Sequence, residues 1–211
     1  MYTYEELKHF VDNCGHCPLA ETRNKSVMGR GILESPIMFF AEAPGNSEDR
    51  DGIPFTGPSG RVFDELLESV GMRREEIYLT NVVKCHPPHN RDPFPQEQEA
   101  CIPYLKYETL LLKPRMIVCL GRIAAQRIIK PDYRITREHG TFIYRKNTWL
   151  TAVYHPSAIL RDPAKMEEAK RDFQQIKEKA DTLFRQLYGE NKSCYDTGIR
   201  RHVYNREGIN C

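Results

Sequence analysis

The sequence predicts an α/β protein, a three-layer α/β/α sandwich around a mostly parallel central sheet. Short apolar runs of strand length, such as residues 37–41 and 115–120, alternate with segments whose apolar residues recur at helical spacing. The run at 37–41 is apolar at every position, as strands buried on both faces of a sheet are. Such alternation places helices on both faces of a parallel sheet.

In the first half of the chain, the expected elements are two helices and two strands. A short amphipathic helix opens the chain, and the second helix stops at Gly71, a residue that commonly ends helices. In chain order, the helix, strand, helix and strand are expected over residues 4–12, 37–41, 62–70 and 77–83.

The second half continues the alternation. A helix over 96–112 cannot pass Pro114, and a third strand over 115–120 turns at Gly121 into another helix. A strand pair follows at 141–144 and 148–153. The last helix begins at Pro163, which suits the first helical position, and carries apolar residues at three- and four-residue spacing to residue 187.

Three polar segments between these elements are predicted to be functional loops: residues 42–60, 86–95 and 154–161. The first is rich in glycine, acids and turn residues, and the prolines of the second exclude a helix. Loops at the carboxyl ends of the strands form the ligand crevice in open α/β sheets. The three loops are therefore expected to build one site.

Composition predicts one globular domain over residues 1–189, followed by a polar tail at 190–211. No apolar run approaches the ~20 residues that cross a bilayer, and the first residues lack the character of a signal peptide. A cytoplasmic protein without a membrane partner is expected. The net charge of +2 permits nucleic-acid binding but does not argue for it, because binding depends on how charges cluster.

Seven cysteines without an export signal favour metal ligands or core thiols over disulfides. Cys14 and Cys17 form a C-x-x-C pair, Cys85 follows a predicted strand, and Cys101 lies in or beside a helix. Four thiolates from three segments suit a zinc ion or an iron–sulfur cluster. The other three are a predicted core thiol and two thiols of the tail without an assigned role: Cys119, Cys194 and Cys211.

Several motifs resemble, in order, those of the family 4 uracil-DNA glycosylases, the iron–sulfur branch of that superfamily. They are the cysteine pair, EAPG at 42–45 followed by Glu48 and Asp49, GIPFTG at 52–57, TNVVKC at 80–85, PHNR at 88–91, Cys101 and HPS at 155–157. One motif would be weak, whereas an ordered series is specific. The resemblance covers about residues 7–187. The chain departs from the family pattern at Ala41, where glycine is usual, and in the tail.

The resemblance implies a monofunctional enzyme that flips uracil out of DNA, hydrolyses its N-glycosidic bond and leaves an abasic site. It also implies a structural [4Fe–4S] cluster on Cys14, Cys17, Cys85 and Cys101. The implied partner is uracil-containing DNA, single- or double-stranded, and the protein is expected to be a monomer.

Uracil recognition requires an aromatic surface and a polar reader of the base edge. Phe55 and Asn81 suit these tasks, with Ala41 beside the base where it would crowd the pocket. A carboxamide accepts from uracil N3–H and donates to O4, and cytosine presents the opposite pattern. A core phenylalanine and an asparagine that caps its own turn are the structural alternatives.

Breaking the glycosidic bond develops negative charge on the base and positive charge on the sugar. His155 is the candidate donor to uracil O2. The resemblance places Glu42, Glu48 and Asn90 close to the sugar, and which of them positions the water stays open at this point. Outside the HPS context, His155 would be an ordinary structural histidine.

DNA contacts are predicted for residues of the same loops. Hydroxyls and cations bind phosphates, and a long apolar side chain fills the gap that a flipped base leaves. The predicted phosphate contacts are Ser59, Arg61, Lys84, Arg91, Ser157 and Arg161, and the predicted wedge is Ile159 with Leu160.

Three other functions stay open. A protein that binds or covalently traps uracil-containing DNA is suggested by His86 and His89 between the cysteine segments, but the chain lacks the long basic insertion of such proteins. A zinc-stabilised nucleotide-binding module leaves the HPS loop unused. A glycosylase/lyase requires a lysine that forms a Schiff base, and only Lys84 lies inside a motif.

Overall fold

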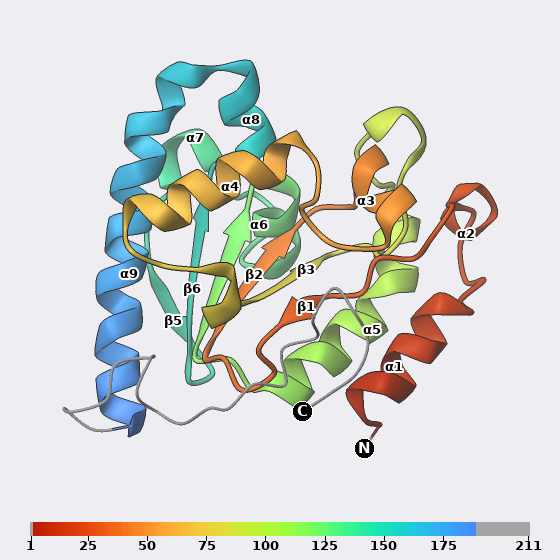
Figure 1. The fold of residues 1–211 in the computed structure, drawn as a ribbon, viewed down its shortest axis with the longest axis horizontal. Helices are drawn as coiled ribbons and strands as arrows, with labels where there is room; N and C mark the ends of the chain where they lie inside the picture. Colours follow the sequence, from red (N-terminus) through yellow and green to blue (C-terminus); the bar gives the residue numbers. More distant parts are fainter. Residues whose placement is uncertain (1, 189–211) are drawn as a thin grey trace.

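A six-stranded sheet forms the centre of the part of the chain that the computed structural model describes, residues 2–188 (Figure 1). Its strand order is β1-β3-β2-β4-β6-β5. The four central strands are parallel, and the two edge strands run antiparallel to their neighbours. The strands are β1 (Arg30–Gly31), β2 (Ile37–Ala41), β3 (Tyr78–Asn81), β4 (Met116–Leu120), β5 (Ile143–Arg145) and β6 (Thr148–Val153).

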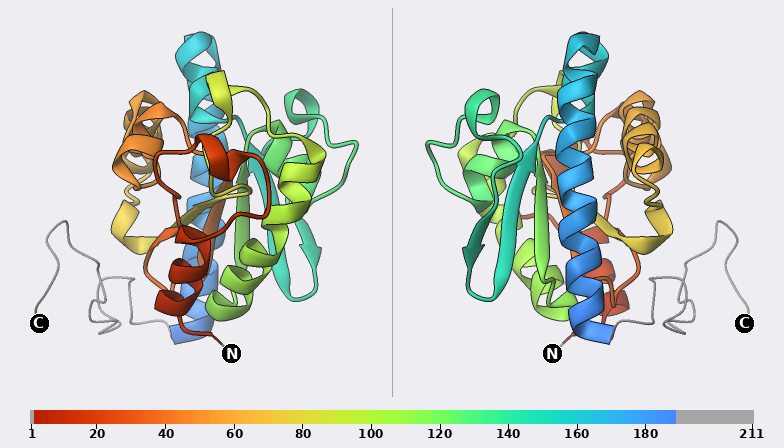
Figure 2. Two further views of the ribbon diagram at one scale, coloured as in Figure 1. Left: turned by 90° about the vertical axis from the view of Figure 1, so that its right-hand side faces the viewer. Right: turned by 90° about the vertical axis from the view of Figure 1, so that its left-hand side faces the viewer.

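Helices cover both faces of this sheet, and the left view of Figure 2 shows α4 and α5 on opposite sides of it. The helices are α1 (Tyr4–Asp12), α2 (Leu19–Thr22), α3 (Asn46–Asp51), α4 (Pro58–Ser69), α5 (Pro95–Leu112), α6 (Arg122–Ile128), α7 (Ile135–Glu138), α8 (Pro156–Arg161) and α9 (Met166–Tyr188). The predicted three-layer α/β/α architecture is confirmed.

Two apolar cores result from the alternation of side chains along the strands. Phe39 of β2 faces α4 and α9, where it packs against Phe63 and Phe173. Its neighbours Met38 and Phe40 point to the opposite face and belong to the core under α5 and α6. Because both faces are covered, β2 is buried at every position, as its uninterrupted apolar run predicts.

Strand register brings the functional loops together. Ala41 pairs with Asn81 across β2 and β3, and Leu120 pairs with Val153 across β4 and β6. The carboxyl ends of the four parallel strands therefore lie at one edge of the sheet. The segments that follow them are the three predicted loops and the turn at Gly121.

Several local predictions are wrong. The segment 154–161 is not a loop, because α8 begins at Pro156 with His155 as its N-cap. The loop at 42–60 contains α3, whose first turn carries Glu48. Pro163 begins a 3₁₀ turn, Pro163–Lys165, and the long helix starts at Met166. The predicted tail, with Cys194 and Cys211, lies outside the described residues. None of the described helices has the length and apolar character to span a bilayer.

Candidate active site

A cavity of about 610 Å³ lies at the carboxyl edge of the sheet. Eleven predicted site residues line it: Glu42, Glu48, Phe55, Ser59, Asn81, Asn90, Arg91, His155, Ser157, Leu160 and Arg161. They come from segments between residues 42 and 161, which the fold brings together. The cavity is large enough to hold a nucleobase with its sugar.

Phe55 supplies an aromatic wall, and its backbone is held in an unusual conformation. Its φ is +58°, a region that bulky side chains rarely adopt. The Arg74 guanidinium donates to the Phe55 carbonyl at 2.8 Å and to the Gly60 carbonyl at 3.0 Å. The ring packs on Phe63, with centroids 5.1 Å apart, and lies 5.9 Å from the His155 ring. Phe55 thus belongs to the core and to the cavity at once.

Asn81 is the last residue of β3, and its side chain is 1% exposed. Its Oδ1 is buried and accepts no hydrogen bond from any of the described residues. Buried polar atoms are normally paired, so this oxygen is available to a ligand in the cavity. Ala41, the partner of Asn81 across the strands, is fully buried and does not line the cavity. The contact of Ala41 with the base therefore stays a prediction.

His155 presents one ring nitrogen to the cavity because the other is already bound. The backbone N–H of Ser157 donates to Nδ1 at 3.1 Å, and the Ser157 hydroxyl lies 2.7 Å from it. Nδ1 is thus the acceptor, and the proton of the neutral ring resides on Nε2. Burial, and secondarily Arg161, lowers the pKa of His155 to about 4. At neutral pH, the residue is a neutral donor.

Gly121 gives His155 the room it needs. Its φ is +90°, and a Cβ at this position would lie 2.9 Å from the Cβ of His155. Both steric facts require glycine in the turn between β4 and α6. The sequence alone predicts only that Gly121 forms the turn before a helix.

Glu42 has a raised affinity for protons. Burial is the main cause and Asp92 the next, and they raise the pKa of Glu42 to about 7 although Arg122 and Arg161 oppose them. Asp92 itself pairs with Arg122 at 2.6 Å. A carboxyl group with a pKa near neutrality is suited to exchange a proton during a reaction.

Glu48 and Asn90 have partners within the loops. The two Glu48 oxygens accept the backbone N–H groups of Gly57 at 2.9 Å and Gly45 at 3.0 Å. Glu48 therefore ties the two arms of the 42–60 loop together. The Asn90 oxygen lies 3.1 Å from Nε2 of His86, and Asn90 has a positive φ of 54°.

Of the predicted DNA contacts, five side chains line the cavity and three do not. Ser59, Arg91, Ser157, Leu160 and Arg161 line it, and Leu160 is 47% exposed. Ile159 is 2% exposed in the core under α8, so its prediction as a wedge is wrong. Arg61 lines a different cavity, of about 460 Å³ beside β1, and its contact with DNA stays a prediction.

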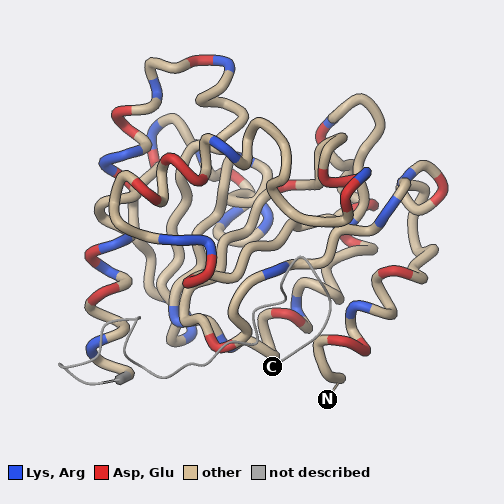
Figure 3. Tube along the Cα trace, in the orientation of Figure 1, with Lys and Arg blue, Asp and Glu red and all other residues tan. Residues whose placement is uncertain are grey.

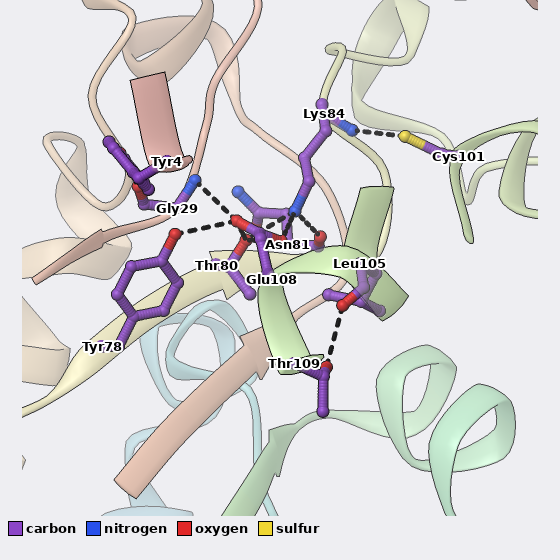
Figure 4. Close-up of polar contacts among 10 residues, drawn as sticks. All are labelled: Tyr4, Gly29, Tyr78, Thr80, Asn81, Lys84, Cys101, Leu105, Glu108 and Thr109. Atoms are coloured by element: carbon purple, nitrogen blue, oxygen red, sulfur yellow. Dashed lines mark hydrogen bonds and ion pairs between the residues drawn. The ribbon is translucent and has the colours of Figure 1, made fainter. Parts of the chain in front are cut away.

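The prediction that Lys84 contacts phosphate is also wrong. Lys84 is 1% exposed, and its ammonium pairs with the buried carboxylate of Glu108 at 2.5 Å (Figure 4). Burial withdraws this charge from solvent and from any DNA strand. Lys and Arg are interspersed with Asp and Glu along the described trace (Figure 3).

The four cysteines of the predicted cluster line one small cavity beside the site. Arg23 donates to the Cys85 sulfur at 3.0 Å, and the backbone N–H of Lys84 donates to the Cys101 sulfur at 3.3 Å. Hydrogen bonds to sulfur favour thiolate ligands, so the donor set fits an iron–sulfur cluster. No set of three or more candidate ligands within residues 2–188 already has metal-site geometry. Cys119 is a buried core thiol, as predicted.

Four residues that support the site were not predicted from the sequence. Arg74 holds the Phe55 backbone, Asp92 and Arg122 surround Glu42, and Glu108 neutralises Lys84. Of these, only Asp92 lies within a segment that was singled out. These contacts join residues up to 80 positions apart, and no local pattern signals such contacts.

A sheet edge that combines an aromatic wall, an unpaired carboxamide oxygen and a neutral imidazole donor defines a site for a planar, hydrogen-bonding group such as a base. A family model described as "Uracil DNA glycosylase superfamily" matches residues 28–180. A "Type-4 uracil-DNA glycosylase" of Archaeoglobus fulgidus is 40% identical over 197 residues, which are 87% of this chain and 98% of that protein.

A second relative of the same description, from Thermotoga maritima, is 40% identical over 172 residues, 77% of this chain and 88% of that protein. A "Type-5 uracil-DNA glycosylase" of Thermus thermophilus is 37% identical over 120 residues, 50% of this chain and 54% of that protein. The chain belongs to the uracil-DNA glycosylase superfamily and, within it, to the type-4 family.

Proposed function

We propose that this protein removes uracil from DNA by hydrolysing the N-glycosidic bond, which releases free uracil and leaves an abasic site for base excision repair. The convergence of Phe55, Asn81 and His155 on one cavity is the observation that carries the proposal. The relatives described as type-4 uracil-DNA glycosylases support the same activity over most of the chain.

The flipped base stacks on Phe55 and is read by Asn81. The unpaired Asn81 Oδ1 accepts from uracil N3–H, and its amide group donates to O4. Cytosine offers an acceptor at N3 and a donor at the amino group, so both contacts with Asn81 would be mismatched. Buried unpaired polar groups are costly, and the site therefore selects uracil.

His155 stabilises the leaving base. When the bond between C1′ and N1 breaks, its electron pair moves onto uracil, and negative charge develops at O2. The neutral His155 donates a hydrogen bond from Nε2 to that oxygen. Because the low pKa keeps the ring neutral, this contact is a hydrogen bond rather than a proton transfer from an imidazolium.

Glu42 is the residue that we assign to the water. Both oxygens of Glu48 are engaged by backbone amides, whereas Glu42 lines the cavity with a pKa near 7. In the hydrolysis, water attacks C1′ and gives its proton to the Glu42 carboxylate. Glu48 and Asn90 keep the surrounding loops in place.

The DNA strand is held by side chains that line the cavity. Ser59, Ser157 and Arg161 contact phosphates, while Arg91 is oriented by two hydrogen bonds to Glu97. The exposed Leu160 enters the gap that the flipped nucleotide leaves.

A [4Fe–4S] cluster on Cys14, Cys17, Cys85 and Cys101 completes the proposal. When bound, it supplies iron–thiolate bonds that cross-link the N-terminal segment, the segment after β3 and helix α5. Its role is structural, because these cysteines line a cavity separate from the one that holds His155.

The test uses purified protein with oligonucleotides that carry uracil, cytosine or thymine at one position. Uracil strands should become alkali-labile after incubation, with free uracil released and the other strands intact. Cleavage without alkali would indicate a lyase. Retention of intact uracil DNA, or a covalent adduct in place of free uracil, would overturn the glycosylase proposal in favour of a binding or trapping protein.

A further inference from the structure

A buried ion pair lies directly behind the base reader. Lys84 is 1% exposed and Glu108 is fully buried, and their charged atoms are 2.5 Å apart (Figure 4). Burying two charges is costly, and a well-packed apolar pair is often no less stable. The position of this pair beside Asn81 points to a role other than stability.

Each member of the pair has a full set of partners. The Lys84 ammonium donates to the Thr80 hydroxyl at 2.6 Å and to the Asn81 carbonyl at 2.9 Å, besides Glu108. Glu108 in turn accepts from the Thr80 hydroxyl and from the Tyr78 hydroxyl at 2.9 Å. A network in which every charge is satisfied is rigid.

These contacts fix the backbone on which the Asn81 side chain stands. The N–H groups of the next two residues, Val82 and Val83, donate across to Ala41 and Glu42. The Asn81 carbonyl is bound by Lys84, so Lys84 fixes the end of β3 from within the core. Oδ1 of Asn81 has no partner among the described residues, so this backbone sets where the carboxamide points.

We propose that Lys84, neutralised by Glu108, is a positioning residue for base recognition that acts through Asn81. The inference rests on the proposed function, because Asn81 is the reader only if uracil enters the cavity. Lys84 has no contact with the base or the DNA. Its ammonium keeps the carboxamide aimed at N3 and O4.

The test is a double-mutant cycle that combines loss of the ion pair with loss of the reader. Lys84→Met with Glu108→Gln removes both charges and leaves no buried charge unpaired. This neutral pair and Asn81→Ala are made separately and together, with iron content matched across the proteins. Single-turnover excision of uracil and the thermal unfolding midpoint are measured for each.

The neutral pair should lower excision by about tenfold or more when Asn81 is present, and by less than about threefold when Asn81 is alanine. The double substitution should lose its effect on excision in the Asn81→Ala background only if Lys84 acts through Asn81. Equal losses in the two backgrounds, or no loss in either, would overturn the proposal.

Tyr78→Phe is the matched control, because it removes another partner of Glu108 without touching Asn81. It should lower the unfolding midpoint and leave the excision rate within about twofold of the parent.

A second measurement does not depend on activity. The side-chain amide signal of Asn81 in a ¹⁵N spectrum should shift or broaden in the neutral pair and stay in place in Tyr78→Phe. An unchanged Asn81 signal in the neutral pair would reject the positioning role whatever the excision rate. An inactive parent protein would instead reject the proposed function.

Discussion

Replacing Glu42 by glutamine should make the protein more stable and less active. The substitution keeps the size and polarity of the side chain and removes its ionisation. Burial raises the pKa of Glu42 from 4.5 to about 7, so the folded state disfavours the carboxylate. A neutral glutamine avoids that cost. Catalytic groups held in unfavourable environments show this trade-off between stability and activity.

The size of the stability change follows from the difference between the pKa of Glu42 in the unfolded chain and its pKa in the folded protein. Between about pH 4.5 and pH 7, the unfolded chain releases the Glu42 proton while the folded protein keeps it, so stability falls as pH rises. The free energy of unfolding that is lost through the raised pKa of Glu42 is below about 1 kcal/mol near pH 5. It reaches at most about 3 kcal/mol near pH 8.5, at about 1.4 kcal/mol for each tenfold change in proton affinity.

Denaturant unfolding of the parent and of Glu42→Gln near pH 5 and near pH 8.5 measures this difference. The variant should gain stability at the higher pH and little at the lower. Excision by the parent, as kcat/KM, should rise with pH through about 7 as the carboxylate forms, and the variant should lose that dependence. An equal stability change at both pH values, or a variant that keeps the parent pH profile, would refute the assignment.

Three further outcomes test other parts of the site. His155→Ala should slow single-turnover excision by about 10²–10³ and change DNA affinity much less; comparable losses in both would assign His155 to loop structure. Cys85→Ser should abolish the brown colour of anaerobically purified protein, whereas Cys119→Ser should keep it; the reverse would exclude the proposed ligand set. Leu160→Ala should impair excision from duplex DNA more than from single strands without lowering the unfolding midpoint, whereas Ile159→Ala should cost about 2–5 kcal/mol of stability.

The sheet and its long helices were predictable because their signals are local. Uninterrupted apolar runs mark β2 and β4, and helical spacing marks α4 and α9. Four short helices, α2, α3, α7 and α8, were not predicted. The N-cap of α8 is a histidine rather than a common capping residue, and α8 has only six residues. Its fold depends on packing of Ile159 against the core, which no local pattern reports.

The lining of the cavity was also predictable, for a different reason. Parallel strands end at one edge of the sheet, so residues that follow them in sequence meet in space, as Asn81 and His155 do. The protonation states were not predictable. The neutral state of His155 and the raised pKa of Glu42 depend on burial and on charges contributed by other segments.

Lys84 shows why a motif alone does not determine the role of a side chain. Within the TNVVKC motif, a lysine beside polar loops is a reasonable phosphate contact, and only the position of Glu108 on α5 contradicts it. Glu108 is predicted to lie in a helix, but helical spacing does not reveal that it faces β3. An unpaired lysine here would be a buried charge and would destabilise the fold. The role of Lys84 therefore depends on its pairing with Glu108. The contact that keeps Lys84 away from DNA also places it next to Asn81.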